Sequence, residues 1–289
     1  MRTVIVTDSC CDLPIEFVKE NNIEVLPIRV NLKGEDIPDD LGQTIKYREF
    51  YDMIRAGELP TTSQINSYAF KEVFKKHIDN GESVIYVGFS SALSGCVNSA
   101  KLAKEMLEEE CGEVNVDIID SKSASLGLGL IVYYLSNLLN SGSSKEAAVK
   151  WVEENKLKVN HWFTVDDLNH LKRGGRVSAA AATVGTVLNI KPILHVDDEG
   201  RLIPVSKVKG RKKSLKVLAE KLKEKIIDSE NQVIFISHGD CEEDAIYLKD
   251  IVLSSNSVKD IVINNIGPAV GSHSGPGTVA LFFISDNRY

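Results

Sequence analysis

The sequence predicts an α/β protein: an N-terminal three-layer parallel-sheet domain followed by a second, C-terminal α/β domain. Short β-branched runs alternate with amphipathic helical stretches through the first half, a rhythm typical of βαβ units. After about residue 158 strand candidates outnumber helices. A chain of 289 residues also divides more readily into two domains than it packs as one. We therefore expect domains at residues 1–158 and 159–289.

Three apolar runs in the first half are expected to be buried strands. They are Thr3–Thr7, Val84–Phe89 and Val114–Ile119. Between them, apolar residues recur at helical spacing over residues 70–78 and 97–107, which predicts two amphipathic helices. Ser141–Ser144 is a capping segment, and the helix that it opens is expected to end near Asn155.

The second half contains six strand candidates and fewer helices. The strands are expected at residues 158–164, 191–196, 201–205, 233–237, 260–266 and 278–284. Apolar periodicity predicts helices over Ser214–Asp228 and Glu242–Ser254.

Composition excludes several classes of protein. With 43% hydrophobic and 26% charged residues the chain can build a core, and a net charge of −7 argues against binding nucleic acid through its overall field. The five cysteines form no Cys-x-x-Cys pair, which fits a reducing compartment. The longest apolar stretches, 128–135 and 179–188, fall short of the ~18 residues that span a bilayer. We expect a cytoplasmic protein without stable membrane insertion.

Small polar residues follow three strands of the predicted parallel sheet. They are Thr7-Asp8-Ser9, Ser90-Ser91 and Asp120-Ser121. Ligands of open α/β sheets lie beyond the carboxyl ends of the strands, so these residues fit a site for a small anion or carboxylate. The alternative is that they cap the helices that follow.

The standard catalytic motifs do not fit this chain. No Walker A sequence is present, and the loose dinucleotide pattern at Gly275–Ala280 leads into a strand instead of a helix. Gly271–Gly275 has histidine where a nucleophile elbow needs serine, and the six histidines lack metal-ligand spacing. We therefore expect a binding protein with no catalytic residue, no metal and no cofactor.

Four polar segments that we expect in loops carry hydrogen-bonding groups. They are Pro60–Gln64, Ser90–Gly95, Leu171–Arg176 and Gly267–Gly277. Each has a structural alternative: Ser94 can serve only as an N-cap, and Arg176 can be solvated or pair with a carboxylate. His273, inside the Gly- and Pro-rich segment, is held close to backbone.

A basic cluster precedes and opens the helix expected after residue 210. Its members are Lys207, Lys209, Arg211, Lys212 and Lys213. Cations at a helix N-terminus oppose the helix dipole, at about 0.3–1 kcal/mol each when exposed. The cluster is either a solvated basic turn or a surface that docks an acidic partner or a phosphate.

The polar motifs together resemble those of the bacterial DegV family. In order, they are Thr7-Asp8-Ser9 with Asp12-Leu13-Pro14, Thr62-Ser63-Gln64, Ser90–Gly95, Asp120-Ser121, Gly174-Gly175-Arg176, Asn189–Pro192 and Gly271–Thr278. Each motif alone is weak, but the ordered set extends over essentially the whole chain. The departures are Cys96-Val97, where the family usually has Thr-Tyr, and Ile65, where Pro is common. Cys96-Val97 follows the Ser90–Gly95 motif, and Ile65 follows Thr62-Ser63-Gln64. The resemblance implies that these two motifs hold the carboxylate of a bound fatty acid, so we expect the departures to affect the preference for the acyl chain more than carboxylate binding.

The resemblance implies a two-domain protein that holds one long-chain fatty acid, such as palmitate or a C18 acid, in a tunnel between the domains. It places the fatty acid carboxylate at Thr62 and Ser94, with His273 nearby, and it adds Arg176 to the residues around the carboxylate. Ser63 and Gly95 belong to the same two motifs. Some family members are lipid-presenting subunits of fatty acid kinase, which implies a separate kinase subunit as partner. Lys207, Lys209 and Arg211 are the candidate docking residues for it.

A competing hypothesis is an α/β enzyme for acyl or phosphoryl transfer. It uses His273 together with Asp8 and Ser9, and it requires a hydrogen bond between nucleophile and base. No spacing in the sequence establishes that bond.

Overall fold

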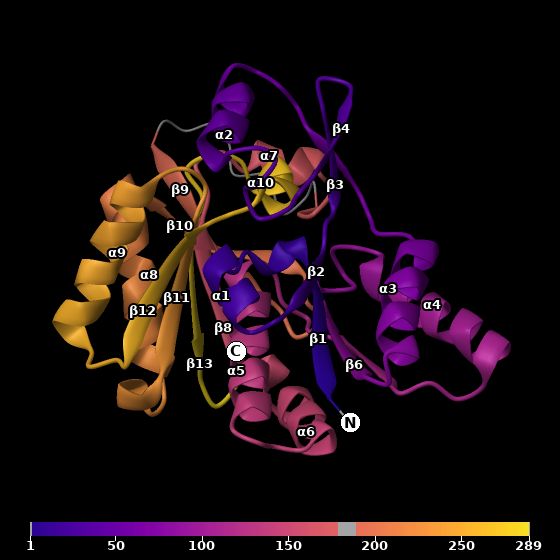
Figure 1. The fold of residues 1–289 in the computed structure, drawn as a ribbon. Helices are drawn as coiled ribbons and strands as arrows, with labels where there is room; N and C mark the ends of the chain where they lie inside the picture. The colour runs from indigo at the N-terminus through magenta and orange to yellow at the C-terminus, as the bar shows by residue number, and fades with distance from the viewer. Residues whose placement is uncertain (1, 179–188, 289) are drawn as a thin grey trace.

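The computed structural model describes residues 2–178 and 189–288, and Figure 1 shows how their helices and strands are arranged. The apolar stretch 179–188 lies outside the described residues. Among those described, strands form three sheets of four, six and three members. A mixed α/β protein with a parallel sheet and a second sheet is confirmed.

The four-stranded sheet is entirely parallel, in the order β2-β1-β6-β7. Its strands are β1 (Thr3–Asp8), β2 (Glu24–Leu26), β6 (Ser83–Gly88) and β7 (Val116–Asp120). The two expected amphipathic helices are α3 (Ser67–Asp79) and α4 (Cys96–Cys111), which pack together beside β6 and β7. α1 (Ile15–Glu20) links β1 to β2. The three strands predicted in this half are confirmed, and β2 was not predicted.

The six-stranded sheet has the order β10-β9-β8-β13-β11-β12, with only β11 and β12 parallel. Its strands are β8 (Val159–Thr164), β9 (Ile190–Val196), β10 (Leu202–Lys209), β11 (Val233–His238), β12 (Asp260–Asn265) and β13 (Val279–Ile284). α8 (Arg211–Lys225) and α9 (Glu242–Ser255) pack on it. All six predicted strands and both helices are confirmed. The domain boundary at residue 158 stays a prediction.

One helix, α5 (Leu126–Asn140), lies between the two larger sheets (Figure 1). It contacts β1 and β6 of the parallel sheet and β8, β11 and β13 of the mixed sheet. Its sequence is apolar on nearly every side, as a helix buried on both faces requires. α6 (Lys145–Asn155) follows, with the Ser144 side chain accepting the Ala147 amide as the predicted cap.

A three-stranded antiparallel sheet that was not predicted lies beside α10 and contains β3 (Arg29–Leu32), β4 (Glu35–Pro38) and β5 (Thr61–Ser63). α2 (Tyr47–Arg55) lies between β4 and β5 in the chain. The expectation that Pro60–Gln64 is a loop is wrong, because Thr61–Ser63 pairs with β3. Such short polar strands depend on their partners more than on their own composition.

The second correction concerns Gly267–Gly277, which was expected to be a loop. Pro268–Ser274 is helix α10, with Pro at its first turn and Gly275 at its C-cap. Proline is favoured at the first position of a helix because its missing N–H has no intrahelical partner there. The predicted glycine turn after Leu171 is confirmed, since α7 (Asn169–Arg173) ends at Gly174.

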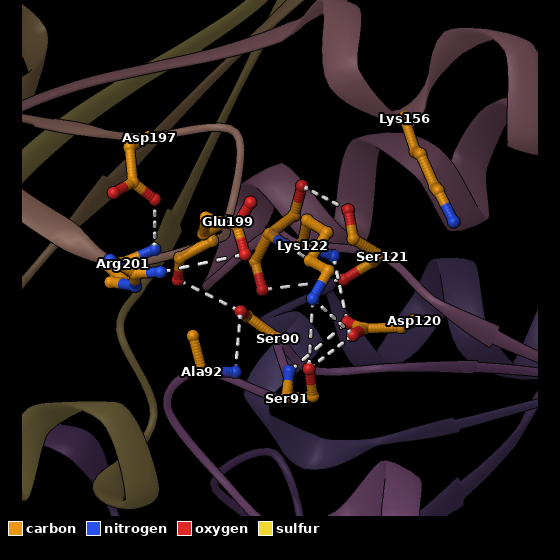
Figure 2. A network of polar contacts seen from close by, with 12 residues as sticks. Ser90, Ser91, Ala92, Asp120, Ser121, Lys122, Lys156, Asp197, Glu199 and Arg201 are labelled. Atoms are coloured by element: carbon orange, nitrogen blue, oxygen red, sulfur yellow. Dashed lines mark hydrogen bonds and ion pairs between the residues drawn. The ribbon is translucent and has the colours of Figure 1, made fainter.

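The carboxyl ends of β6 and β7 hold the turn between β9 and β10 (Figure 2). Ser90 Oγ donates to the Gly200 carbonyl at 2.9 Å, and Lys122 Nζ lies 2.9 Å from Asp120 Oδ2. The buried Arg288 side chain donates to carbonyls of Lys122, Lys156, Val159 and Asp197 and to Ser123 Oγ. The Ser90–Gly200 bond and the bonds from Arg288 to Lys122 and Ser123 fasten the mixed sheet to the parallel sheet.

Candidate functional site

A cavity of about 190 Å³ lies between the two larger sheets, and both halves of the chain line it. That volume is more than ten times the ~10–15 Å³ that one water needs. Its apolar wall consists of Cys10, Ile28, Phe89, Leu93, Ala124, Phe163, Leu171, Val196, Leu202, Ile266, Ala269, Val270, Ala280 and Phe282. Such a lining suits a hydrocarbon chain.

The strand register determines which residues of β13 face the cavity. Thr278, Ala280 and Phe282 alternate along the β13 segment and share one face of the sheet. Ala280 pairs with Phe163 of β8, and Phe282 pairs with His161. The lining therefore extends along β13 from Thr278, beside α10, to the Phe282–His161 pair.

Polar groups gather at the α10 end of this cavity. They come from β5, the β6–α4 loop, the segment after α7, and α10: Thr62, Ser63, Gln64, Ser94, Gly95, Arg176 and His273. The structure thus brings together all six residues that the sequence analysis assigned to carboxylate binding. They come from segments as far apart as residues 62 and 273.

Thr62 and His273 are in direct contact, with 2.8 Å between Thr62 Oγ1 and His273 Nε2. Burial, with a smaller contribution from the Arg176 charge, lowers the pKa of His273 to about 4. The imidazole is therefore neutral at pH 7. Its Nδ1 faces the backbone of Gly174, where an added Cβ would lie 2.2 Å away, and has no hydrogen-bond partner among the described residues.

Arg176 is half-buried, and in the described contacts it pairs with backbone carbonyls and with no carboxylate. Its Nη2 and Nε donate to the Leu93 carbonyl at 3.0 and 3.2 Å, and Nη1 donates to the Gly174 carbonyl. Burial lowers its pKa. Arg176 thus fixes the loop that carries Ser94, and it does so from the other half of the chain.

Ser94 lies at the start of α4. Its Oγ contacts Cys96 Sγ at 3.2 Å and accepts the Cys96 amide at 3.4 Å. Burial raises the pKa of Cys96 to about 11, so the thiol is protonated at neutral pH. Gly95 is required for packing, because a Cβ there would lie 2.0 Å from Gln64 Oε1. The Gln64 amide donates in turn to Ser99 Oγ.

The strand-end residues have structural partners. Asp8 accepts from Tyr86 Oη and the Phe89 amide, both at 2.9 Å, and Ser9 Oγ accepts the Ile28 amide. His273 forms a hydrogen bond with Thr62 and, in the part of the chain that the structure describes, with neither Asp8 nor Ser9. Among the described residues, the hydrogen bond that the enzyme hypothesis requires is therefore not formed.

The basic cluster divides into free and paired cations. Lys207 and Lys209 are exposed on β10, and within the described residues neither forms an ion pair. Arg211 is largely buried: its Nε lies 2.8 Å from Asp244 Oδ2, and Asp166 is also near. Lys212 lies over the Tyr247 ring at 5.5 Å.

Sequence reasoning missed Cys10, Ser125 and His161, which line the cavity outside the motifs. It also assigned no role to Ser274 and Thr278, which line the cavity from within the motif Gly271–Thr278. The alternation of side chains along a strand could have identified some of these residues. His161 and Phe163 are two apart in a predicted strand and share one face, as do Ala280 and Phe282. Over the described ranges, no cluster of three or more metal-ligating side chains is found. No helix among them is long and apolar enough to cross a membrane.

Known proteins were compared with this chain. A family model described as an uncharacterised protein of the DegV family matches residues 2–286. A DegV domain-containing protein of Clostridium perfringens is 45% identical over 287 residues, covering 99% of each chain. A DegV family protein from Thermus thermophilus, described for its fatty acid binding, is 32% identical with a TM-score of 0.89, covering 99% of this chain and 100% of that one. A stearic-acid-binding protein from Eubacterium ventriosum is 26% identical with a TM-score of 0.86, covering 99% and 98%.

The order of the motifs and the fold agree with these matches, which extend over nearly the full length of each protein. This chain belongs to the DegV family.

Proposed function

We propose that this protein binds one long-chain fatty acid, such as palmitate or a C18 acid, with its acyl chain in the cavity between the two larger sheets. The observation that carries the proposal is the Thr62–His273 pair at the polar end of an otherwise largely apolar cavity. The named ligands of the related structures support the same class of ligand.

The acyl chain supplies the affinity. About 14 buried methylenes contribute roughly 11 kcal/mol at ~0.8 kcal/mol each. Ordering the chain and losing translational freedom offset much of that. The polar end then determines which way round the molecule binds.

The carboxylate is held by neutral hydrogen-bond donors. A carboxylate withdrawn from water needs donors, and the hydroxyls of Thr62 and Ser94 supply them beside Ser63 and Gly95. The neutral His273 orients the Thr62 hydroxyl through Nε2. The first amides of α4 add a helix N-terminus, which favours an anion. Arg176 acts on this site through the Leu93 carbonyl. We assign no turnover to the protein itself.

Mass spectrometry tests the binding proposal on protein purified without added lipid. We expect native spectra to show a mass excess that disappears on denaturation and is identified as a long-chain acid. The double variant Thr62→Ala, Ser94→Ala is expected to lose most of it, while Thr61→Ala, exposed on the same strand, keeps it. An apo wild-type mass that persists after incubation with palmitate would refute the proposal.

We also propose that the protein presents the carboxylate to a separate kinase subunit through Lys207 and Lys209. Both free lysines lie on β10, whose Leu202 lines the cavity. Charge reversal at both is expected to abolish capture of the kinase subunit and to spare the bound acid. Arg211 is left intact because its loss would also break the ion pair with Asp244. Unchanged capture contradicts this docking surface.

A further inference from the structure

Two buried carboxylates meet the amino end of α10. Asp12 Oδ1 accepts the Gly267 amide at 2.8 Å, and Asp39 Oδ2 accepts the Ala269 amide at 2.9 Å. A Cβ built on Gly267 would lie 3.0 Å from the Asp12 oxygen and 2.9 Å from the Asp39 oxygen. The two carboxylates therefore lie on either side of a single methyl-sized space.

The pair is closed off from water, since each residue is 1% exposed. Asp12 also accepts a hydrogen bond from Ser125 Oγ, which contacts Ser237 Oγ at 2.9 Å. Asp39 Oδ1 is buried with no hydrogen-bond partner among the described residues. An unpaired buried carboxylate oxygen is costly when ionised, and a proton removes that cost.

The titratable groups around the pair are all acids. They are Asp8 at the end of β1, Cys10 and Cys11 from the segment after it, Asp40 from the loop after β4, and Tyr47 and Tyr51 from α2. Burial is the main cause that raises the pKa of Asp39 to about 7 and that of Asp12 well above its ordinary value. Repulsion between the pair raises the pKa of Asp12 further.

α10 connects this pair to the cavity. Ala269 and Val270, next to the capped amides, line the cavity, and His273 lies one turn further on. Tyr51 Oη fixes the same end of α10 by donating to the Ile266 carbonyl at 2.9 Å. A shift of the amino end of α10 would thus move both the cavity wall and His273.

We propose that Asp12 and Asp39 are positioning residues that hold α10 and His273 in place while the pair carries a proton, so that the bound fatty acid is released faster once that proton is lost. The release part of this inference rests on the proposed function. The state with α10 in place over the buried carboxylates, the closed state, binds the proton more tightly than an open state in which water reaches them. In the open state their pKa returns toward about 4. Opening therefore becomes more favourable as pH rises from about 4 to about 7, and it levels off above that.

The test measures release of palmitate from loaded full-length protein, with excess albumin as the acceptor, between pH 5 and pH 8. For wild type, we expect the release rate to rise several-fold up to about pH 7 and then to remain constant. Asp39→Asn mimics the protonated acid, keeps an oxygen for the Ala269 amide, and is expected to release slowly at every pH. Asp40→Asn, next in the chain and half-buried, removes one neighbouring charge but leaves both carboxylates of the pair, so it is the matched control and is expected to keep a pH-dependent profile like that of wild type.

The ligand's own carboxyl titrates in all three proteins, so the difference between Asp39→Asn and Asp40→Asn isolates the pair. A wild-type profile without pH dependence overturns the inference, as does an Asp39→Asn profile equal to wild type. If Asp39→Asn does not fold, Asp12→Asn takes its place, and the wild-type profile remains decisive by itself.

If wild type binds no palmitate, the proposed function fails and the positioning role is tested separately. Hydrogen exchange at residues 267–274 of the unliganded protein is then compared between Asp39→Asn and Asp40→Asn, each corrected for the intrinsic pH effect. Greater protection in Asp39→Asn at pH 8 supports the positioning role. Equal protection refutes it.

Discussion

The contact between Gly174 and His273 allows a sharp test of the head-group site. Gly174 ends α7 with φ −68° and ψ −10°, values that alanine adopts without strain. A Cβ there would nevertheless lie 2.2 Å from His273 Nδ1 and 3.1 Å from its Cγ. Gly174→Ala must therefore displace the imidazole while leaving the backbone unstrained.

The expected magnitude follows from the hydrogen bond that this displacement breaks. The 2.8 Å contact between Thr62 and His273 is part of the polar end of the cavity. A hydrogen bond contributes about 0.5–1.5 kcal/mol net, and 1.4 kcal/mol is tenfold in affinity. We expect the Kd for palmitate to rise roughly 3- to 10-fold in Gly174→Ala.

The neighbouring glycine provides a matched control. Gly175 has φ +71°, and a Cβ there meets nothing within 4 Å. Gly175→Ala therefore strains the backbone, by about 1–2 kcal/mol, without touching His273. We expect it to lower the free energy of unfolding in urea and to leave the Kd for palmitate unchanged.

Both variants are measured by competitive displacement of a fluorescent fatty acid and by urea denaturation. The reasoning is refuted if Gly174→Ala binds palmitate as wild type does, because His273 would then play no part in the site. It is also refuted if the two variants weaken binding equally, since general strain would then explain the loss.

Three further predictions concern buried Arg288, buried Asp8 and the cysteines. Arg288→Ala removes five hydrogen bonds and is expected to lower the free energy of unfolding by about 3–5 kcal/mol, and Arg288→Lys is not expected to restore it. Equal urea midpoints for wild type and Arg288→Ala would contradict this. Burial raises the pKa of Asp8 from 3.8 to about 6, so the folded state binds more protons than the unfolded state and its stability falls as pH rises from about 4 to about 6. Asp8→Asn is expected to flatten that part of the plot of unfolding free energy against pH. Exposed Cys111 is expected to react first with a thiol reagent in native protein, and buried Cys96 only after unfolding, which peptide mapping checks.

Elements with a strong local signal were predicted from the sequence. β1, β6 and β8 are continuous buried runs, and they lie within one or two residues of the predicted ranges. The helix after Ser144 was predicted from its cap. Burial of apolar side chains decides these segments, and the pattern of such side chains is visible in one dimension.

The candidate site was predicted as a set of motifs and could not be predicted as a geometry. Thr62 and His273 are 211 residues apart, and their contact depends on the packing of β5 against α10. The role of Arg176 was also open, because only the folded chain brings the Leu93 carbonyl to its guanidinium. Side-chain partners far apart in sequence leave no local signal.

The sequence by itself determined the parallel sheet, the strands of the mixed sheet and the residues available for a head-group site. Tertiary structure alone decided α10, the helix that carries His273. A seven-residue segment with glycine at its middle is too short and too poor a helix former to be stable alone. Asp12 and Asp39 accept its first free amides, and Tyr51 holds the carbonyl before it. These contacts supply the free energy that local propensity lacks, and they form only when distant parts of the chain have folded together.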